Sequence, residues 1–243
     1  MSRPSAGTSQ GRTLLLWDID GTLLLTDGAG MRGMARAARK LYGDAFRWDG
    51  VSASGRLDPL ILEDALARNG LSTSDDGHRR FHDAYLLELA AELELVRDRA
   101  RAMPGVKEAI AALRERGRLK NDVAQGLVTG NYARAAPLKL RACGFDPAWF
   151  EIGAFGDEGR TRPDLVALAL ARCEARLSWS PDPKRVVVIG DTPLDIDCAH
   201  AHGCIALAVA TGHHDVTELR AAGADVVVED LSDPTPLFEL LAS

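Results

Sequence analysis

The chain has 243 residues and a formal net charge of −6; 46% of its residues are hydrophobic and 26% are charged. This composition excludes a disordered tail, a collagen and a coiled-coil rod, and it provides enough apolar residues for a buried core. A mildly acidic chain is poorly suited to a polyanionic partner, so we expect no nucleic acid partner. A small phosphate-containing ligand would have to be held by a few individually placed cations.

No apolar run reaches the roughly 18 residues that a membrane span requires, so no membrane partner is expected. The run Leu14–Trp17 is too short for the core of a signal peptide and leads directly into acidic residues. Four cysteines show no metal-binding spacing and are expected to be reduced packing residues: Cys143, Cys173, Cys198 and Cys204. These features predict a cytoplasmic protein and leave its oligomeric state open.

The first hundred residues are predicted to contain one strand and then only helices. Residues 1–12 are small and polar, and we expect a flexible N-terminal segment there. The apolar run 13–17 predicts a buried strand. Apolar residues at helical spacing then predict three helices, at 31–42, 59–69 and 78–101.

From residue 103 onward, strands and helices alternate. Strands are expected at 123–129, 150–155, 185–189, 204–209 and 225–228. Helices are expected at 106–116, where Gly117 would end the helix, and at 133–143, 165–175 and 195–202. This alternation is typical of a doubly wound parallel α/β sheet with helices on both faces. We therefore predict an α/β core of residues 13–27 and 102–243, with a smaller helical cap domain, 28–101, inserted after the first strand.

Two acidic pairs follow strands of the predicted sheet. Asp18 and Asp20 come directly after the first strand, and Asp191 and Asp195 come after the strand at 185–189. Ligands bind at the carboxyl ends of parallel strands, so both pairs should face one site. Either pair alone is also compatible with a turn or a helix cap. Together they favour a hard divalent cation, and Mg²⁺ is the first choice.

Two further segments offer groups for an anion at the same edge. One strand ends and a predicted helix begins at Thr129, Gly130 and Asn131. The hydroxyl and the backbone N–H groups of this segment either form an anion-binding site or only cap the helix. Arg160 and Arg162 follow the strand at 150–155 and provide either a site cation or solvated loop side chains.

The motifs together resemble the haloacid dehalogenase superfamily of phosphotransferases, over about residues 13–230. The segment from Asp18 to Leu23 is similar to the first motif DxDGT[LV], Thr129 matches the Ser/Thr of the second, and Gly190–Asp195 matches the fourth motif GDxxxD. The third motif is usually Lys-Pro, whereas Arg162 precedes the proline here; Arg keeps the charge but not the compact ammonium. The helical insert resembles the C1 cap of phosphoglycolate-phosphatase-like members.

The resemblance implies a Mg²⁺-dependent phosphatase acting on a small organic phosphomonoester. Asp18 would attack phosphorus and form an aspartyl-phosphate, and Asp20 would protonate the leaving oxygen and then activate water. Thr129 and either Arg162 or Arg160 would hold the phosphoryl oxygens.

The resemblance also implies a set of metal ligands. Asp18, the backbone carbonyl of Asp20 and Asp191 would hold Mg²⁺, and Asp195 would be a ligand or an outer residue. Asp20 also favours phosphoryl chemistry over carbon–halogen cleavage, because a departing halide needs no proton.

Two other segments admit more than one interpretation. Gly28–Gly33 has the form GxGxxG of a dinucleotide site, but Asp27 would repel a pyrophosphate, so we interpret it as a hinge into the cap. Arg56 would either help to recognise the substrate from the cap or lie exposed beside Asp58, which would then be the N-cap of the next helix. A phosphosugar mutase and a non-catalytic regulatory module that binds phosphate or Mg²⁺ remain alternatives, and the sequence does not name the substrate.

Overall fold

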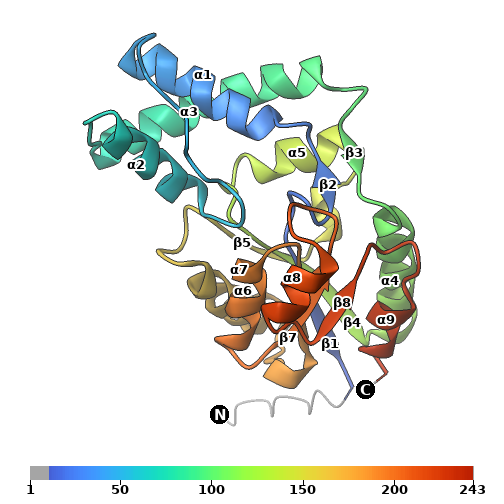
Figure 1. The fold of residues 1–243 in the computed structure, drawn as a ribbon. Helices are drawn as coiled ribbons and strands as arrows, with labels where there is room; N and C mark the ends of the chain where they lie inside the picture. Colours follow the sequence, from blue (N-terminus) through green and yellow to red (C-terminus); the bar gives the residue numbers. More distant parts are fainter. Residues whose placement is uncertain (1–10, 243) are drawn as a thin grey trace, which may run out of the picture.

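The computed structural model describes residues 11–242, and the part of the predicted flexible segment at 1–10 lies outside the described residues (Figure 1). At its centre is a six-stranded sheet in the order β5-β4-β1-β6-β7-β8, and every neighbouring pair is parallel. The strands are β1 (Thr13–Trp17), β4 (Val123–Thr129), β5 (Ile152–Phe155), β6 (Val186–Gly190), β7 (Ile205–Val209) and β8 (Val226–Val228).

The strand β1 lies in the middle because all of its side chains are buried and apolar groups cover both faces of the sheet. Its Leu16 stands in register with Gly126 of β4 on one side and Val188 of β6 on the other. The carboxyl ends of β4, β1 and β6 therefore lie next to one another.

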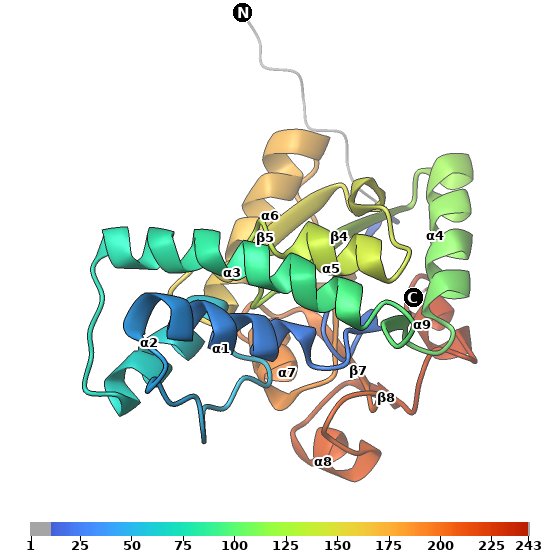
Figure 2. The ribbon, with the colours of Figure 1, turned by 90° about the horizontal axis from the view of Figure 1, so that it is seen from above.

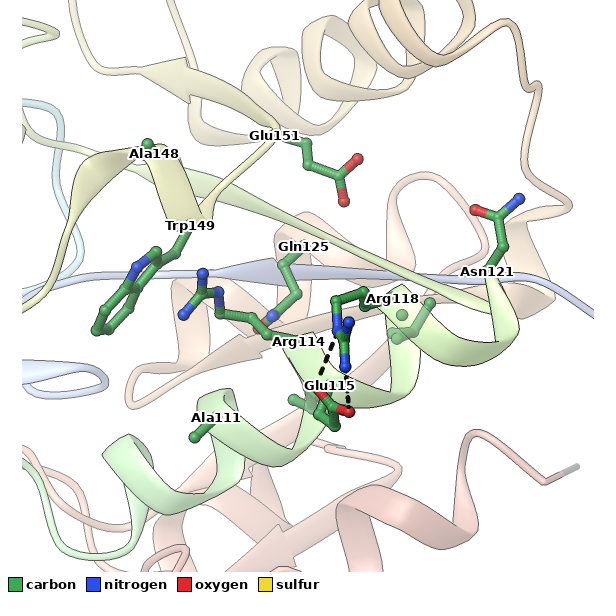
Figure 3. Close-up of a pocket in the computed structure, with 12 residues that line it drawn as sticks. Ala111, Arg114, Glu115, Arg118, Asn121, Gln125, Ala148, Trp149 and Glu151 are labelled. Carbon is green, nitrogen blue, oxygen red and sulfur yellow. Dashed lines mark hydrogen bonds and ion pairs between the residues drawn. The ribbon is translucent and has the colours of Figure 1, made fainter.

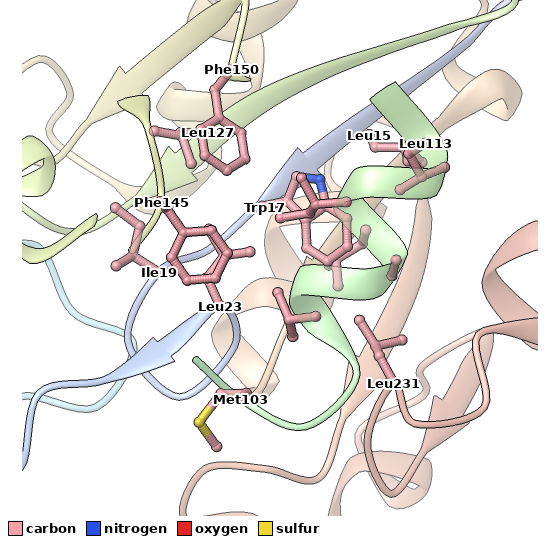
Figure 4. Close-up of a cluster of buried hydrophobic side chains, with 14 of the residues drawn as sticks. Leu15, Trp17, Ile19, Leu23, Met103, Leu113, Leu127, Phe145, Phe150 and Leu231 are labelled. Carbon is pink, nitrogen blue, oxygen red and sulfur yellow. The ribbon is translucent and has the colours of Figure 1, made fainter. Parts of the chain in front are cut away.

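Helices cover both faces of the sheet (Figure 1). One face carries α4 (Val106–Lys120), α5 (Ala136–Ala142) and α9 (Thr235–Glu239), and the other carries α6 (Arg162–Leu177), α7 (Pro193–His200) and α8 (Val216–Ala221). Two short 3-10 turns, η1 (Pro147–Trp149) and η2 (Pro183–Arg185), complete the core. Figure 4 shows the apolar cluster on the α4 face, where Trp17 and Phe145 are buried beside Leu127.

Three helices inserted after β1 form a cap with its own hydrophobic cluster: α1 (Ala29–Tyr42), α2 (Asp58–Arg68) and α3 (Asp75–Leu95). Two short antiparallel strands, β2 (Leu24–Leu25) and β3 (Arg101–Ala102), join the cap to the core. Helices α1 and α3 lie side by side in Figure 2. The predicted α/β core with a helical insertion is confirmed; its boundaries at 28 and 101 stay a prediction.

Several predicted helix ends were wrong. Helix α4 continues through Gly117 to Lys120 and ends where Asn121 adopts a positive φ of 53°. Gly117 serves packing instead, because a Cβ there would lie 2.9 Å from the carbonyl oxygen of Val123. Helix α3 begins before its predicted start and ends at Leu95, and the predicted region after it forms a turn and β3. Helices α8 and α9 were not predicted, because each is very short.

Among the described residues, no helix has both the length and the apolar character needed to span a membrane. All four cysteines are buried and free, which confirms that they are packing residues.

Candidate active site

Three carboxylates meet at the carboxyl edge of the sheet. Asp18 follows β1, Asp191 follows β6, and Asp195 lies in the first turn of α7. One oxygen of each lies within 4.8 Å of the others, and no residue of the three is more than 5% exposed. The structure thus brings together the two acidic segments that the sequence places after separate strands.

The turn between β6 and α7 fixes Asp191 and Asp195 in different ways. Thr192 is the N-cap of α7, and both its backbone N–H and its Oγ1 donate to Oδ2 of Asp195, at 3.1 and 2.7 Å. Asp191 precedes the helix and accepts a hydrogen bond of 3.1 Å from Oγ1 of Thr22. Of the pair that the sequence allowed as a helix cap, Asp195 takes part in the capping box as the third residue of α7, and Thr192, not Asp191, is the N-cap.

Arg162 supplies the cation of this cluster. Its guanidinium is buried; Nη2 lies 3.1 Å from Oδ1 of Asp18 and also pairs with Asp195. Its Nη1 donates to the carbonyl oxygen of Gly55 in the cap, at 2.7 Å. Arg160 is exposed, and its backbone N–H donates to Asp164. The structure thus places Arg162, and not Arg160, in the cluster.

Burial raises the pKa values of two of these acids. It raises the pKa of Asp18 to about 6, although Arg162 opposes the shift and Asp195 adds to it. Burial and then the charge of Asp18 raise the pKa of Asp191 to about 8. The cluster therefore has an excess of negative charge that a bound cation would relieve.

The donor set fits a hard divalent cation such as Mg²⁺. The backbone closes tightly around Asp191, since a Cβ on either Gly21 or Gly212 would overlap its carboxylate. Both oxygens of Asp195 already accept hydrogen bonds, which suits an outer residue better than a ligand. Asp18 and Asp191 are the carboxylates best placed to ligate a metal ion, and the carboxylate of Asp20 lies outside the cluster.

The carboxylate of Asp20 is held by two donors on the core. Its Oδ2 accepts hydrogen bonds from Nδ2 of Asn131, at 2.8 Å, and from Nζ of Lys139, at 2.6 Å. Lys139 was not predicted from the sequence as a site residue. The structure buries it, and only 4% of it is exposed. The available signal was a lysine between Ala136 and Leu140, on the buried face of an otherwise apolar helical segment.

Another buried acid, Asp58, joins the cap to the core. Its backbone N–H donates to the carbonyl oxygen of Gly130, and its Oδ2 accepts from the backbone N–H of Tyr132. Burial raises its pKa to about 7, against the effect of Lys139. The interpretation of Asp58 as a helix cap was wrong, since Leu57 is the N-cap of α2 and the Asp58 carboxylate binds the core.

The segment after β4 places a hydroxyl at the same edge. Thr129 is fully buried, and its Oγ1 accepts from Nδ2 of Asn131 at 2.8 Å, which leaves the hydroxyl hydrogen for a ligand. Helix α5 begins only at Ala136, later than predicted, so this segment does not open it directly. Gly130 allows the cap loop to dock, because a Cβ there would overlap the carbonyl oxygen of Arg56.

A cavity of about 550 Å³ lies over these groups. From the core it is lined by Asp18, Asp20, Gly130, Asn131, Thr129, Lys139, Arg162, Asp191 and His213, and from the cap by Met31, Met34, Arg56, Asp58, Ile61 and Tyr85. Arg56 thus faces the cavity, and its Nη1 lies 3.2 Å from a carboxylate oxygen of Asp64. The volume is within the usual range for small-molecule sites.

A second cavity, of about 480 Å³, lies at the amino end of β4 (Figure 3). Arg114 stacks on the ring of Trp149, at 4.7 Å from the ring centroid, and Arg118 pairs with Glu115 at 2.8 Å. Its described lining contains no cluster of acids and no activated nucleophile. Asp18 and Asp191 of the acidic cluster line the first cavity instead.

Known proteins share the fold. A hydrolase from Pseudomonas syringae is 22% identical, with a TM-score of 0.69, and the match covers 96% of this chain and 100% of that chain. CbbY from Rhodobacter sphaeroides in complex with phosphate is 21% identical, with a TM-score of 0.70, over 91% of this chain and 96% of that chain. β-Phosphoglucomutase from Clostridium difficile is 14% identical, with a TM-score of 0.68, over 95% of this chain and 97% of that chain. At these identities the likeness shows the fold alone. No curated protein matches the chain.

The sequence itself supplies the stronger evidence. A family model described as haloacid dehalogenase-like hydrolase matches residues 13–203, which include the segments that carry Asp18, Thr129, Arg162, Asp191 and Asp195. Because this match spans most of the chain and all the strand ends that form the acidic cluster, the protein belongs to the haloacid dehalogenase-like hydrolases.

Proposed function

We propose that the protein is a Mg²⁺-dependent phosphatase that hydrolyses a small organic phosphomonoester through an aspartyl-phosphate on Asp18. The observation that supports this most strongly is a buried carboxylate, Asp18, that lies against the guanidinium of Arg162 and lines the cavity between cap and core. A phosphate dianion repels a carboxylate nucleophile, so such a reaction needs fixed positive charge at that place.

In the first half-reaction, an oxygen of Asp18 attacks phosphorus as the bond from phosphorus to the ester oxygen breaks. The electron pair leaves with the ester oxygen, which takes a proton from the carboxyl group of Asp20 and departs as the alcohol. In the second half-reaction, Asp20 accepts a proton from water as the water oxygen attacks the aspartyl-phosphate. The products are inorganic phosphate and the regenerated Asp18.

The surrounding residues support these steps. The hydroxyl of Thr129 and the guanidinium of Arg162 would hold phosphoryl oxygens, while Asn131 and Lys139 fix the carboxylate of Asp20. Asp18, Asp191 and the backbone carbonyl of Asp20 would hold Mg²⁺. When bound, the ion would offset the charge between Asp18 and the phosphoryl group. The cytoplasmic location predicted from the sequence belongs to this proposal.

The test is release of p-nitrophenol from p-nitrophenyl phosphate with and without Mg²⁺. We expect turnover that EDTA abolishes, a loss of about 1,000-fold or more in Asp18→Asn and a large decrease in Asp20→Asn. Asp197→Asn changes an exposed acid of α7 and should behave as wild type. Full activity in purified Asp18→Asn would overturn the assignment of the nucleophile.

A phosphomutase would return the phosphoryl group to a sugar phosphate. Phosphorus NMR of the products separates the two activities, because free phosphate indicates a hydrolase and an isomeric phosphate ester indicates a mutase. Metal binding without turnover on a broad panel of phosphomonoesters would instead indicate a non-catalytic module.

A further inference from the structure

We propose that the leaving group of the substrate is an uncharged, partly apolar alcohol that carries no second phosphate or carboxylate. This inference rests on the proposed phosphatase function and adds the substrate class. Three properties of the cavity support it: the wall that the cap provides, the pairing of its cations, and two neutral polar groups without partners.

The cap side of the cavity is mainly apolar. Met31, Met34, Ile61 and the ring of Tyr85 line it, and Leu25 contributes from the linker. Met34, Ile61 and Tyr85 are at most 2% exposed, so their positions are fixed by the packing of the cap. A leaving group that enters this space exchanges water for apolar contacts, which favours hydrocarbon over charged groups.

Each lysine or arginine among the described lining residues is already paired. Arg162 is held by Asp18 and Asp195, and Lys139 by Asp20. The phosphoryl group that reacts would use Arg162 and Asp20 holds Lys139, so Arg56 is the one of these three side chains that remains for a second anion.

Arg56 is tied within the cap. Its Nη1 lies 3.2 Å from Oδ2 of Asp64 and donates to the carbonyl oxygen of Ser52 at 3.1 Å, and its Nη2 lies 3.4 Å from the carbonyl oxygen of Leu60. Binding a second anion through Arg56 would break this set of contacts. Asp27 and Asp58 also line the cavity, and they would repel that anion when they are ionised.

Two neutral polar atoms in the cavity wall have no hydrogen-bond partner among the residues that the structure describes. The hydroxyl of Tyr85 and Oδ1 of Asn131 are both buried, and both residues line the cavity. Oδ1 of Asn131 only accepts hydrogen bonds, so it suits a hydroxyl of the substrate and disfavours an anion. The cavity is therefore equipped for alcohol groups.

A neighbour of the same fold provides a contrast. A structure of CbbY from Rhodobacter sphaeroides, 20% identical to this chain, contains xylulose-(1,5)bisphosphate, a ligand with two phosphates. In this chain the described lysine and arginine side chains of the cavity are taken up by its own carboxylates.

The experiment compares two substrates that differ in one charge. Phenyl phosphate has a neutral leaving group, whereas 4-carboxyphenyl phosphate has the same ring with a carboxylate and leaves slightly more readily. With Mg²⁺ present, we expect kcat/KM to be at least about tenfold higher for phenyl phosphate, although 4-carboxyphenyl phosphate has the better leaving group. Equal or higher kcat/KM for 4-carboxyphenyl phosphate would overturn the inference.

A variant tests whether the cap wall is responsible. Met31→Lys places a cation in the cavity at a half-buried position and should shift the ratio of kcat/KM values about tenfold toward 4-carboxyphenyl phosphate. Leu87→Lys adds the same charge at a residue of α3 that is 74% exposed, and should leave the ratio unchanged. An unchanged ratio in Met31→Lys would count against the cap wall as the contact of the leaving group.

Hydrolysis of p-nitrophenyl phosphate, measured in parallel, distinguishes the two ways of failing. Turnover combined with a preference for the carboxylate substrate overturns only the substrate class. No turnover of any of the three esters overturns the proposed function, and the substrate class with it.

Discussion

Nζ of Lys139 lies 2.6 Å from Oδ2 of Asp20, although the two residues are 119 positions apart in the chain. Burial lowers the pKa of Lys139, but Asp20 and Asp58 outweigh it and raise the pKa overall, so the side chain stays an ammonium. One buried cation thus faces both the proposed acid–base residue and an acid of the cap. It fixes the carboxylate of Asp20 from the core side.

We expect Lys139→Met to lower kcat about 10- to 100-fold with little change in KM. Without the ammonium, only Asn131 still holds the carboxylate of Asp20, so proton transfer occurs from a less defined position. Lys139→Arg keeps a charged donor and should recover part of the loss. Steady-state kinetics on a phosphomonoester with a poor leaving group is the measurement, because such an ester depends most on proton donation.

Arg141→Met is the matched control, since Arg141 is an exposed residue of the same helix. It should keep the wild-type kcat. A Lys139→Met protein with wild-type kcat, or one that only loses substrate affinity, would show that Lys139 does not position Asp20.

Substitution of Arg162 tests which arginine serves the site. Arg162→Met should lower kcat/KM about 100-fold or more, because it removes the guanidinium that lies 3.1 Å from Asp18. Arg162→Lys should fall between this variant and the wild type, since it keeps the charge but loses the bidentate fork. Arg160→Met changes an exposed side chain and should have no effect; a loss in that variant alone would reverse the assignment.

Addition of Mg²⁺ should stabilise the protein through Asp191. We expect Mg²⁺ to raise the melting temperature of the wild type by a few degrees and to have little effect on Asp191→Asn. In EDTA at pH 8, Asp191→Asn should be at least as stable as the wild type, because it removes a buried acid that Asp18 repels. Differential scanning fluorimetry with Asp197→Asn as the control measures both effects. An equal response of wild type and Asp191→Asn to Mg²⁺ would exclude Asp191 as a ligand.

The parts of the site that the sequence predicted are those that depend on sheet topology. Alternating strands and helices place Asp18 and Asp191 at adjacent strand ends, whatever the detailed packing is. The register of β1 between β4 and β6 then brings Thr129 to the same edge. Such residues can be inferred because a parallel sheet allows few arrangements.

The residues that the sequence did not reveal depend on tertiary contacts between segments that are far apart in the chain. The pairing of Lys139 with Asp20 and the binding of Asp58 to Tyr132 join segments that are 119 and 74 residues apart. No local pattern encodes such contacts. Similarly, Gly117 reads as a helix end, but its approach to Val123 is a tertiary contact.

The raised pKa of Asp58 predicts a dependence of stability on pH. Its ordinary value is 3.8 and its value in the fold is about 7, so folding favours the protonated acid. The resulting contribution to stability is complete below about pH 4 and is lost as the pH rises through 7. Asp58→Asn has no charge to gain and keeps a carbonyl oxygen for the N–H of Tyr132. The loss of unfolding free energy between pH 5 and 8 should therefore be smaller in this variant, by about 1 to 3 kcal/mol.

Urea unfolding in EDTA at the two pH values measures this difference. Other buried acids contribute to the pH dependence in both proteins, so the comparison between variant and wild type isolates the effect of Asp58. Asp197→Asn removes an exposed acid of α7, and its loss should match that of the wild type. The contrary outcome is that Asp58→Asn loses as much unfolding free energy between pH 5 and 8 as the wild type does. That result would mean that the carboxyl group of Asp58 is ionised in the fold at both pH values, and that the cap docks on the core with the Asp58 carboxylate charged.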